Sequence, residues 1–254
     1  MNELMIVIII VATIALLMRV YKSIVTKHTK IKLGVIQILA DGAVVEAMNH
    51  QIQASSELPF AGSIPASFFA NYLVMRESGY GANYHGLLSA YLFKWEMAGI
   101  VKTELVSETD VYLTFDDTVM PTEEIELELY EILKSNDMFR APGFDYTLLH
   151  PWDKKILAIG ENELLEAKDV AFDQKGRIRF TRQGYDQSLS HGSFEKYFRD
   201  ISSATFCKMD PKRQQQELSF ALLLELTEEI EAYVKAGQNV PEVLQIANRV
   251  WRVL

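Results

Sequence analysis

The chain has 254 residues, enough for one large domain or two small ones whose core needs no disulfide or metal ion. Hydrophobic residues make up 49% of it and charged residues 23%, and the only cysteine is Cys207, which excludes an internal disulfide and the class of small disulfide-rich domains. The formal net charge of −9 argues against a surface built mainly for nucleic acid.

The chain begins with an apolar segment. Between Leu4 and Met18 only Thr13 is polar, and the run continues to Tyr21 past a single arginine. Its length approaches the roughly 20 residues that cross a bilayer as a helix. The segment therefore predicts a transmembrane anchor.

A cleaved signal peptide is the alternative for an apolar segment of this length. Signal peptides begin with lysine or arginine, whereas this chain begins with Met1, Asn2 and Glu3. The basic residues come later, and no acidic residue separates them from Asp41. Under the positive-inside rule this predicts a single-pass protein of the cell membrane, with its N-terminus outside and its C-terminal domain in the cytoplasm. The residues expected at the membrane surface are Arg19, Lys22, Lys27, Lys30 and Lys32.

Residues 1–32 are interpreted as this anchor with its basic juxtamembrane segment, and residues 33–62 as a connector to a folded domain. The connector is apolar but contains Gln37, Asp41 and Glu46, which would lie unpaired in hydrocarbon, so a second span is not expected. We expect it to pack on the domain or to lie at the membrane surface. The turn-forming residues of "ASSELPFAGSIP" place the start of the domain near its end.

Residues 63–120 have the pattern of a first winged-helix-like module. Ser63 is expected to cap one helix and Asn83 a second, which Gly99 ends in a left-handed turn with Ile100 folded back on it. The segments "IVKTELV" and "VYLTF" then predict a two-stranded ribbon. The apolar face of the second helix contains Leu87, Leu88, Tyr91, Leu92 and Trp95.

Residues 121–200 repeat this order of elements as a second winged-helix-like module. A helix begins at Pro121, Gly176 predicts a turn before a short strand at residues 178–180, and Thr181 is expected to cap the helix that follows. The two segments share little residue identity, so we interpret them as related modules and not as a repeat array.

Residues 201–254 are expected to be helical. One helix is predicted to run to Gly237, and Pro241 begins a final helix with an apolar face. We expect this face to pack on the protein's own core, with a partner protein as the alternative. The expected fold is mainly α with short β-ribbons: an N-terminal transmembrane helix, two winged-helix-like modules and C-terminal helices. The apolar face of the final helix contains Val243, Leu244, Ala247, Val250, Trp251 and Leu254.

Two segments, "LLSAYLFKWEMAGIVKTE" and "TRQGYDQSLSHGSFEKYFRDIS", resemble the cytosolic part of a bacterial membrane-protein family described as domain of unknown function 2207. The resemblance covers roughly residues 60–235 and is concentrated in the helix that ends at Gly99, in the exit from the second ribbon and in the helix from Phe194 to Asp200. It implies a membrane-anchored protein with a cytosolic globular part. The chain resembles a shortened member, because it contains neither the outer domain nor the glycine-rich tail common there. The family supplies no catalytic residue.

The patterns that mark common catalytic and cofactor sites do not occur in the sequence. "GYGANYHG" resembles a glycine-rich phosphate loop, but it joins two expected helices, so an inter-helix turn is favoured. Ser190 lies beside His191, yet adjacent residues rarely face each other and no acid completes the pair. We predict no cofactor, no metal and no catalytic residue, so the chain is not interpreted as an enzyme. The histidines, none paired at metal-ligand spacing, are His28, His50, His85, His150 and His191.

Charge separates the two functions that the expected fold allows. Residues 31–254 contain 21 basic and 33 acidic residues, a net charge of −12. Lys94 is the only basic residue of the candidate reading helix, and the ribbon segment "VKTELVSETD" has three acids and one lysine. Phosphate contacts supply most non-specific affinity for DNA. We therefore predict a protein-interaction or scaffold domain with an unknown protein partner, and the alternative is a membrane-tethered DNA-binding transcription regulator.

A short basic stretch, "KGRIRFTR", lies at the second ribbon. Alternate residues of a strand share a face, so Arg177 and Arg179 are expected side by side, facing an acidic partner or anionic lipid headgroups. The alternative is an edge strand that charge protects from aggregation. The candidate interaction residues are Lys175, Arg177, Arg179 and Arg182.

The topology expected from the N-terminal segment is testable with reporter fusions at Leu254. A reporter active only in the cytoplasm should be active there, because the basic residues after the apolar segment hold the following chain inside. A matched fusion of a reporter active only outside the cytoplasm should be silent. Activity of the second reporter would contradict the predicted orientation.

Overall fold

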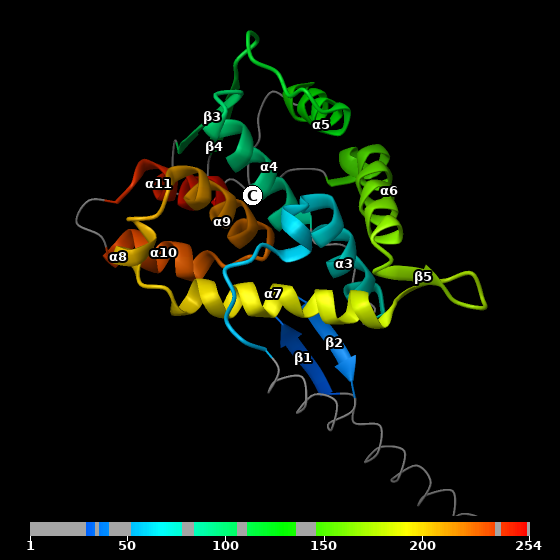
Figure 1. Cartoon of the computed structure of the whole chain (residues 1–254). Helices are drawn as coiled ribbons and strands as arrows, with labels where there is room; N and C mark the ends of the chain where they lie inside the picture. Colours follow the sequence, from blue (N-terminus) through cyan, green and yellow to red (C-terminus); the bar gives the residue numbers. More distant parts are fainter. Residues whose placement is uncertain are drawn as a thin grey trace, which may run out of the picture.

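The computed structural model of the chain describes residues 29–33, 36–40, 52–77, 84–105, 111–135, 146–236 and 240–252. Helices make up most of this part of the chain (Figure 1). In chain order the elements are β1 (Thr29–Leu33), β2 (Ile36–Ala40), the 3-10 helix η1 (Pro59–Gly62), α3 (Ile64–Glu77), α4 (Tyr84–Met97), β3 (Val101–Leu105), β4 (Val111–Phe115), α5 (Glu124–Ser135), the 3-10 helix η2 (Tyr146–Leu149), α6 (His150–Glu166), β5 (Val170–Phe172), β6 (Ile178–Phe180), α7 (Arg182–Asp200), α8 (Ser203–Phe206), α9 (Pro211–Leu223), α10 (Thr227–Ala236) and α11 (Glu242–Trp251).

The sheets of the described residues are three antiparallel ribbons of two strands each: β1–β2, β3–β4 and β5–β6. In β3–β4, Val101 lies opposite Phe115 and Thr103 opposite Leu113. Residues opposite each other in a ladder share a face, and these four form the face that packs on the helices. The ribbons that the sequence predicts, β3–β4 and β5–β6, are confirmed.

Two predicted helix ends are present where the sequence places them. The Ser63 hydroxyl accepts a hydrogen bond from the backbone N–H of Ala66 at 3.1 Å and so caps α3. Gly99 has φ +73°, and the backbone N–H of Ile100 turns back to donate to the carbonyl of Trp95 at 2.9 Å. The predicted cap at Asn83 lies outside the described residues.

The start of α7 also follows its prediction. Gly176 has φ +70° in the turn of the β5–β6 hairpin, and the hydroxyl of Thr181 accepts from the backbone N–H of Gly184 at 3.1 Å. A Cβ atom at Gly184 would lie 1.7 Å from the carbonyl oxygen of Asp169, so only glycine lets this turn of α7 lie against the end of β5.

The expectation of two winged-helix-like modules is wrong. α4 packs against α9 and α11 from the other end of the chain, whereas α3 packs against α6 (Figure 1). Two glycines show how close these contacts are: a Cβ atom at Gly86 of α4 would lie 2.5 Å from the carbonyl oxygen of Leu223, and one at Gly160 of α6 would lie 2.3 Å from that of Pro65. Because helices far apart in the sequence approach this closely, the two halves interleave in a shared core.

The expected transmembrane helix is not among the helices described. None of those helices combines the length and the apolar composition that crossing a bilayer requires, and the predicted span at residues 4–21 lies outside the described residues. The fold of the described residues is therefore a helical domain with three two-stranded ribbons.

The basic residues predicted at the membrane surface are only partly described. Arg19, Lys22 and Lys27 lie outside the described residues. Lys30 and Lys32 belong to β1, where they pair with Leu39 and Gln37 of β2. The end of the predicted juxtamembrane segment and the start of the predicted connector thus form a strand hairpin, in which β1 packs on α7 and β2 packs on α3.

The single helix predicted up to Gly237 is two helices. α9 ends at Leu223 and α10 begins at Thr227, and between them Glu225 has φ +57°. The leucines on either side, Leu224 and Leu226, are both buried, so the chain reverses while it keeps apolar residues in the core.

The final helix packs on the protein's own core, as predicted. Leu244, Ala247 and Val250 of α11 are fully buried. Their helix contacts α4, α9 and α10. Trp251 is half-buried and packs at the edge of the same core, and Leu254 lies outside the described residues.

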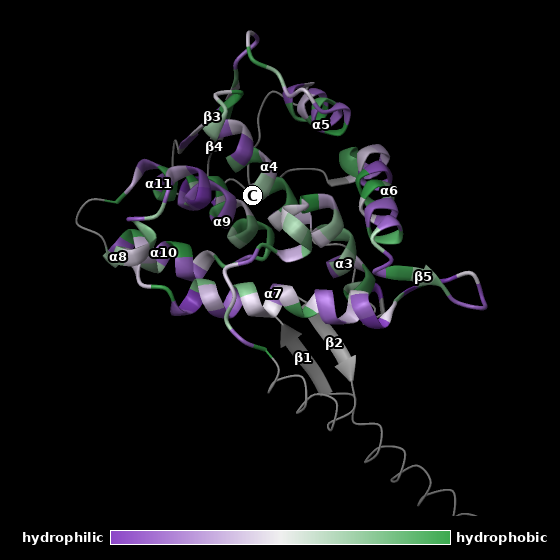
Figure 2. Cartoon of the chain, in the orientation of Figure 1, coloured by the Kyte–Doolittle hydropathy of each residue, from purple (hydrophilic) through white to green (hydrophobic). Residues whose placement is uncertain are grey.

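Trp95 lies at the centre of the main core. It is fully buried, as is Trp152, and its ring meets the ring of Tyr130 edge-on with centroids 6.2 Å apart. The indole N–H donates to the carboxylate of Glu126 at 2.9 Å, and Lys94 forms an ion pair with the same carboxylate. Figure 2 shows α4 in mostly hydrophobic colours, whereas α7 alternates between hydrophilic and hydrophobic residues.

Replacing Trp95 with alanine should lower the free energy of unfolding by about 3–5 kcal/mol, because the change opens a cavity and removes the partner of a buried carboxylate. Chemical denaturation of the chain measures it. Met97→Ala is the matched control on the same helix, since Met97 is exposed, and it should change stability by no more than about 0.5 kcal/mol. Equal effects would contradict the packing of α4.

Candidate functional site

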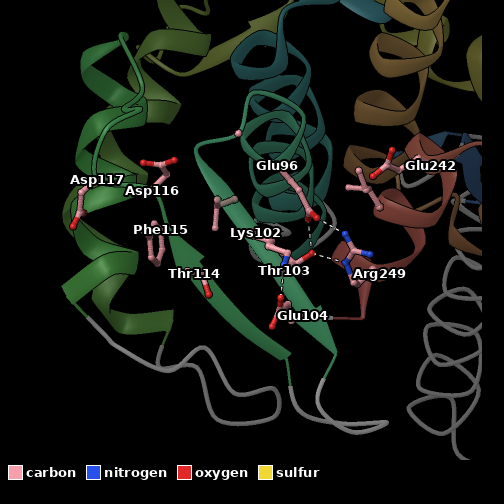
Figure 3. A pocket seen from close by; sticks show the side chains of 13 residues that line it. Glu96, Lys102, Thr103, Glu104, Thr114, Phe115, Asp116, Asp117, Glu242 and Arg249 are labelled. Atoms are coloured by element: carbon pink, nitrogen blue, oxygen red, sulfur yellow. Dashed lines mark hydrogen bonds and ion pairs between the residues drawn. The ribbon is translucent and has the colours of Figure 1, made fainter.

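A groove lies between the C-terminal end of α4, the β3–β4 ribbon and α11 (Figure 3). We call it the α4–β3–α11 groove. Its volume is about 1120 Å³, near the upper end of the range of about 300–1,000 Å³ that is typical of small-molecule pockets. Its charged and hydroxyl-bearing lining residues are Glu96, Lys102, Thr103, Glu104, Thr114, Asp116, Asp117, Glu242 and Arg249.

Three of these side chains form the floor of the groove. The guanidinium of Arg249 forms an ion pair with Glu96 and donates to the Thr103 hydroxyl at 2.8 Å, and that hydroxyl donates to Glu96. Glu96 belongs to α4, Thr103 to β3 and Arg249 to α11, so the cluster ties three elements together (Figure 3). The side chain of Glu96 is only 7% exposed, which makes its pairing with Arg249 important for stability.

The rim of the groove is acidic. Glu104 forms an ion pair with Lys102 at 2.5 Å, and the hydrogen bond from Lys102 lowers the pKa of its carboxyl. Asp116 accepts hydrogen bonds from the side chain and the backbone N–H of Thr118, at 2.6 and 2.8 Å, and these lower its pKa as well. Both carboxyls are therefore charged at neutral pH.

The remaining rim acids are Asp117 and Glu242. Asp117 forms an ion pair with Lys134 of α5. Glu242 lies in the first turn of α11, where the helix dipole favours a negative charge. Among the described residues, no basic side chain forms an ion pair with Asp116 or Glu242. The lining contains five acidic and two basic residues, so the groove carries an excess of negative charge.

Exposed apolar side chains lie close in sequence to the lining residues. Met97, next to Glu96, is 36% exposed, and Val119 and Met120, which follow Asp117, are 38% and 45% exposed. They can add apolar contact area to an acidic surface.

The basic stretch that the sequence singles out lies elsewhere, on the β5–β6 hairpin and at the start of α7. The carboxylate of Asp173 contacts Arg177 at 2.9 Å and Arg179 at 3.7 Å, so these two arginines do converge on one side of the hairpin. Arg182 is 3.4 Å from Asp186, one turn along α7. Lys175 is exposed in the turn.

Sequence reasoning did not identify the groove. Glu96 and Arg249 are 153 positions apart, and no local motif connects them. One signal was available: Thr103 is a polar residue at a position of β3 that faces inward, and buried hydroxyls need hydrogen-bond partners.

The chain was compared with protein families, with curated proteins and with solved structures. No protein-family model, no curated protein and no solved structure matches it. The resemblance of two segments to the membrane-protein family named above stays a prediction.

Ser190 and His191 do not form a catalytic pair. His191 is fully buried against the ring of Phe60, with centroids 5.3 Å apart, and the buried hydroxyl of Ser190 has no hydrogen-bond partner among the described residues. Burial lowers the pKa of His191 to about 3, and a contact with the backbone of Ser188 opposes this only in part. No cluster of His, Cys, Asp and Glu that could hold a metal ion occurs in the described residues.

The buried histidine predicts how stability depends on pH. Because the folded pKa is about 3 and the unfolded value is 6.5, the unfolded chain alone binds a proton between these pH values. This contribution to the free energy of unfolding is complete above pH 6.5 and falls as the pH is lowered, with a slope approaching about 1.4 kcal/mol per pH unit.

The measurement is chemical denaturation at a series of pH values for the wild type and for His191→Leu. The difference between their slopes isolates the histidine, because the carboxyls that titrate in the same range are common to both chains. The same pH slope in the two chains would show that His191 is not buried in its neutral form.

Proposed function

We propose that the protein binds a partner protein through a basic segment that lies in the α4–β3–α11 groove. The observation that carries the proposal is the charge of the groove, whose lining contains five carboxylates and two basic side chains. Exposed apolar side chains also lie close in sequence to residues that line the groove. Lysine and arginine on a partner would meet the carboxylates, and its apolar residues would meet Met97, Val119 and Met120.

The floor of the groove supports this role because it is already ordered without a partner. Glu96, Thr103 and Arg249 are held by bonds to one another, and they link α4, β3 and α11. A surface that does not have to order itself on binding loses less conformational entropy. The unpaired carboxylates at Asp116 and Glu242 then remain for the partner.

Within this proposal the chain acts as an interaction or scaffold domain. Its partner is defined by chemistry, as a protein segment that combines basic and apolar residues. Its location at the cell membrane stays a prediction of the sequence, which the reporter fusions at Leu254 test.

The second candidate function is that of a membrane-tethered DNA-binding regulator, and two observations argue against it. α4 is the helix that the sequence offers for reading a major groove, yet every residue from 86 to 93 is buried. Its one lysine, Lys94, is engaged by Glu123 at 3.5 Å and by Glu126. A reading helix needs an exposed face and basic residues to contact phosphates.

Reversing the two unpaired charges of the groove should remove partner binding. The change is Asp116→Lys with Glu242→Lys, and the control is Glu131→Lys with Asp200→Lys, an equal change of charge at exposed positions away from the groove. A phage-displayed library of random peptides, selected on the immobilised full chain, identifies the segment chemistry. Wild type and control should enrich peptides rich in lysine and arginine, and the groove variant should not.

Two results would contradict the proposal. One is enrichment of the same basic peptides by the wild type and the groove variant, which would place binding elsewhere. The other is enrichment of acidic or purely apolar peptides by the wild type. Denaturation of each variant by urea checks that the charge changes leave the fold intact.

Duplex DNA should show no measurable binding to the full chain at physiological salt. The reason is the net charge of −12 over residues 31–254 together with the burial of α4. Binding is measured with random and genomic duplexes across a series of salt concentrations. Sequence-selective binding that weakens steeply with added salt would favour the regulator over the interaction domain.

A further inference from the structure

The β5–β6 hairpin has one apolar face that begins in the core and ends in solvent. Val170 lies opposite Phe180 and Phe172 opposite Ile178, so these four side chains share a face. Val170 and Ile178 are buried in the smaller core cluster, and Phe180 packs against it. Phe172, at the end of the row, is 60% exposed, more than any other large apolar residue described.

Packing within the domain does not explain why an exposed position of the hairpin holds a phenylalanine. Val170 and Ile178 already attach the hairpin to the core, and Phe172 adds little buried area. A large aromatic side chain at a tip that projects from the domain (Figure 1) offers contact area to another surface. Figure 2 shows the hydrophobic strand β5 leading into a hydrophilic tip.

The other face of the hairpin is basic. Ala171 lies opposite Arg179 on that face, and both are accessible to solvent. Arg177 is 54% exposed and Arg182, at the start of α7, is 89% exposed, and each also contacts one acidic side chain, Asp173 and Asp186 respectively. Residues 168–186 contain five basic and three acidic residues, a net charge of +2, although residues 31–254 as a whole carry −12.

We propose that the tip of the β5–β6 hairpin docks on an anionic lipid bilayer, with Phe172 in the interface between headgroups and acyl chains and the basic side chains on the headgroups. Charge complementarity selects this occupant, because the hairpin is a local positive region on an acidic domain. The projecting shape of the hairpin is also consistent with a bilayer as the occupant. A bilayer accepts a projecting aromatic side chain without a matching cavity, whereas a protein partner would need one.

The position of the hairpin in the fold is consistent with a membrane contact. β6 and β1 both pack on α7, and β2 packs on α3. The hairpin and β1 therefore adjoin the same helix. The acidic groove lies at the β3–β4 ribbon, away from the β5–β6 hairpin (Figure 1), so membrane docking and partner binding would use separate surfaces.

The test places a fluorescent side chain at the tip. In Phe172→Trp the added indole reports its depth, because lipids brominated near the headgroup end of the acyl chains quench only tryptophans that enter the interface. The full chain is mixed with vesicles of phosphatidylcholine alone or with phosphatidylglycerol added. We expect quenching of the added tryptophan in the anionic vesicles and little quenching in the neutral ones.

Met120→Trp is the matched control. Met120 is also exposed but lies outside the basic hairpin, three residues after the groove residue Asp117 in sequence, so its tryptophan should stay unquenched in both vesicles. The native residues Trp95 and Trp152 are fully buried and Trp251 is half-buried, and all three contribute the same background to each variant. The control separates docking of the hairpin from a general attachment of the chain to vesicles.

Adding Lys175→Gln and Arg182→Gln to Phe172→Trp tests the electrostatic part. The ratio of docked to undocked hairpin in anionic vesicles should fall about five-fold for each charge removed, the factor that corresponds to about 1 kcal/mol per basic residue at such a surface. Quenching that is equal at positions 172 and 120, that is absent at both, or that is the same in neutral and anionic vesicles would overturn the proposal.

Discussion

The enclosure of α4 is the constraint on which the rest of the structure depends. Gly86 brings its first turn against the carbonyl end of α9, and Trp95 anchors its last turn among aromatic rings and the carboxylate of Glu126. A helix that is buried from its first turn to its last needs packing partners on several sides. α9, α11 and the β3–β4 ribbon supply them, so helices from the C-terminal third of the chain complete the core around α4.

The groove follows from this enclosure. Because α11 packs on α4 and on β3, Arg249 reaches the end of α4 and pairs with Glu96 there. This ion pair neutralises the positive charge of Arg249 on α11. The acidic residues of the ribbon and of the first turn of α11 stay at the rim. The polar floor and the acidic rim are therefore two results of one packing arrangement: the floor fixes the geometry, and the rim would select the chemistry of the partner that we propose.

Local signals in the sequence were reliable and long-range ones were absent. Ser63 and Thr181 begin helices and Gly99 ends one as predicted, because each acts within four residues of itself. The prediction of two winged-helix-like modules was wrong because close helix packing at Gly86 and Gly160 brings together helices that no sequence motif relates. The groove and the break between α9 and α10 were missed for the same reason. Both depend on how distant parts of the chain pack in the core, which local sequence does not show.

Charge is distributed unevenly over the described surface of the domain. The described surface is acidic around the groove and basic at the β5–β6 hairpin, so an anionic bilayer attracts one region and repels the other. If the hairpin docks on an anionic bilayer as we propose, repulsion at the groove and attraction at the hairpin would act together as a torque that favours the hairpin toward the lipid and the groove toward the solvent. Screening limits both forces to about 8 Å at physiological salt, so they orient the domain only when something else keeps it close to the membrane. A basic partner in the groove would then approach from the side away from the bilayer, where its own positive charge does not compete with the hairpin for the lipid.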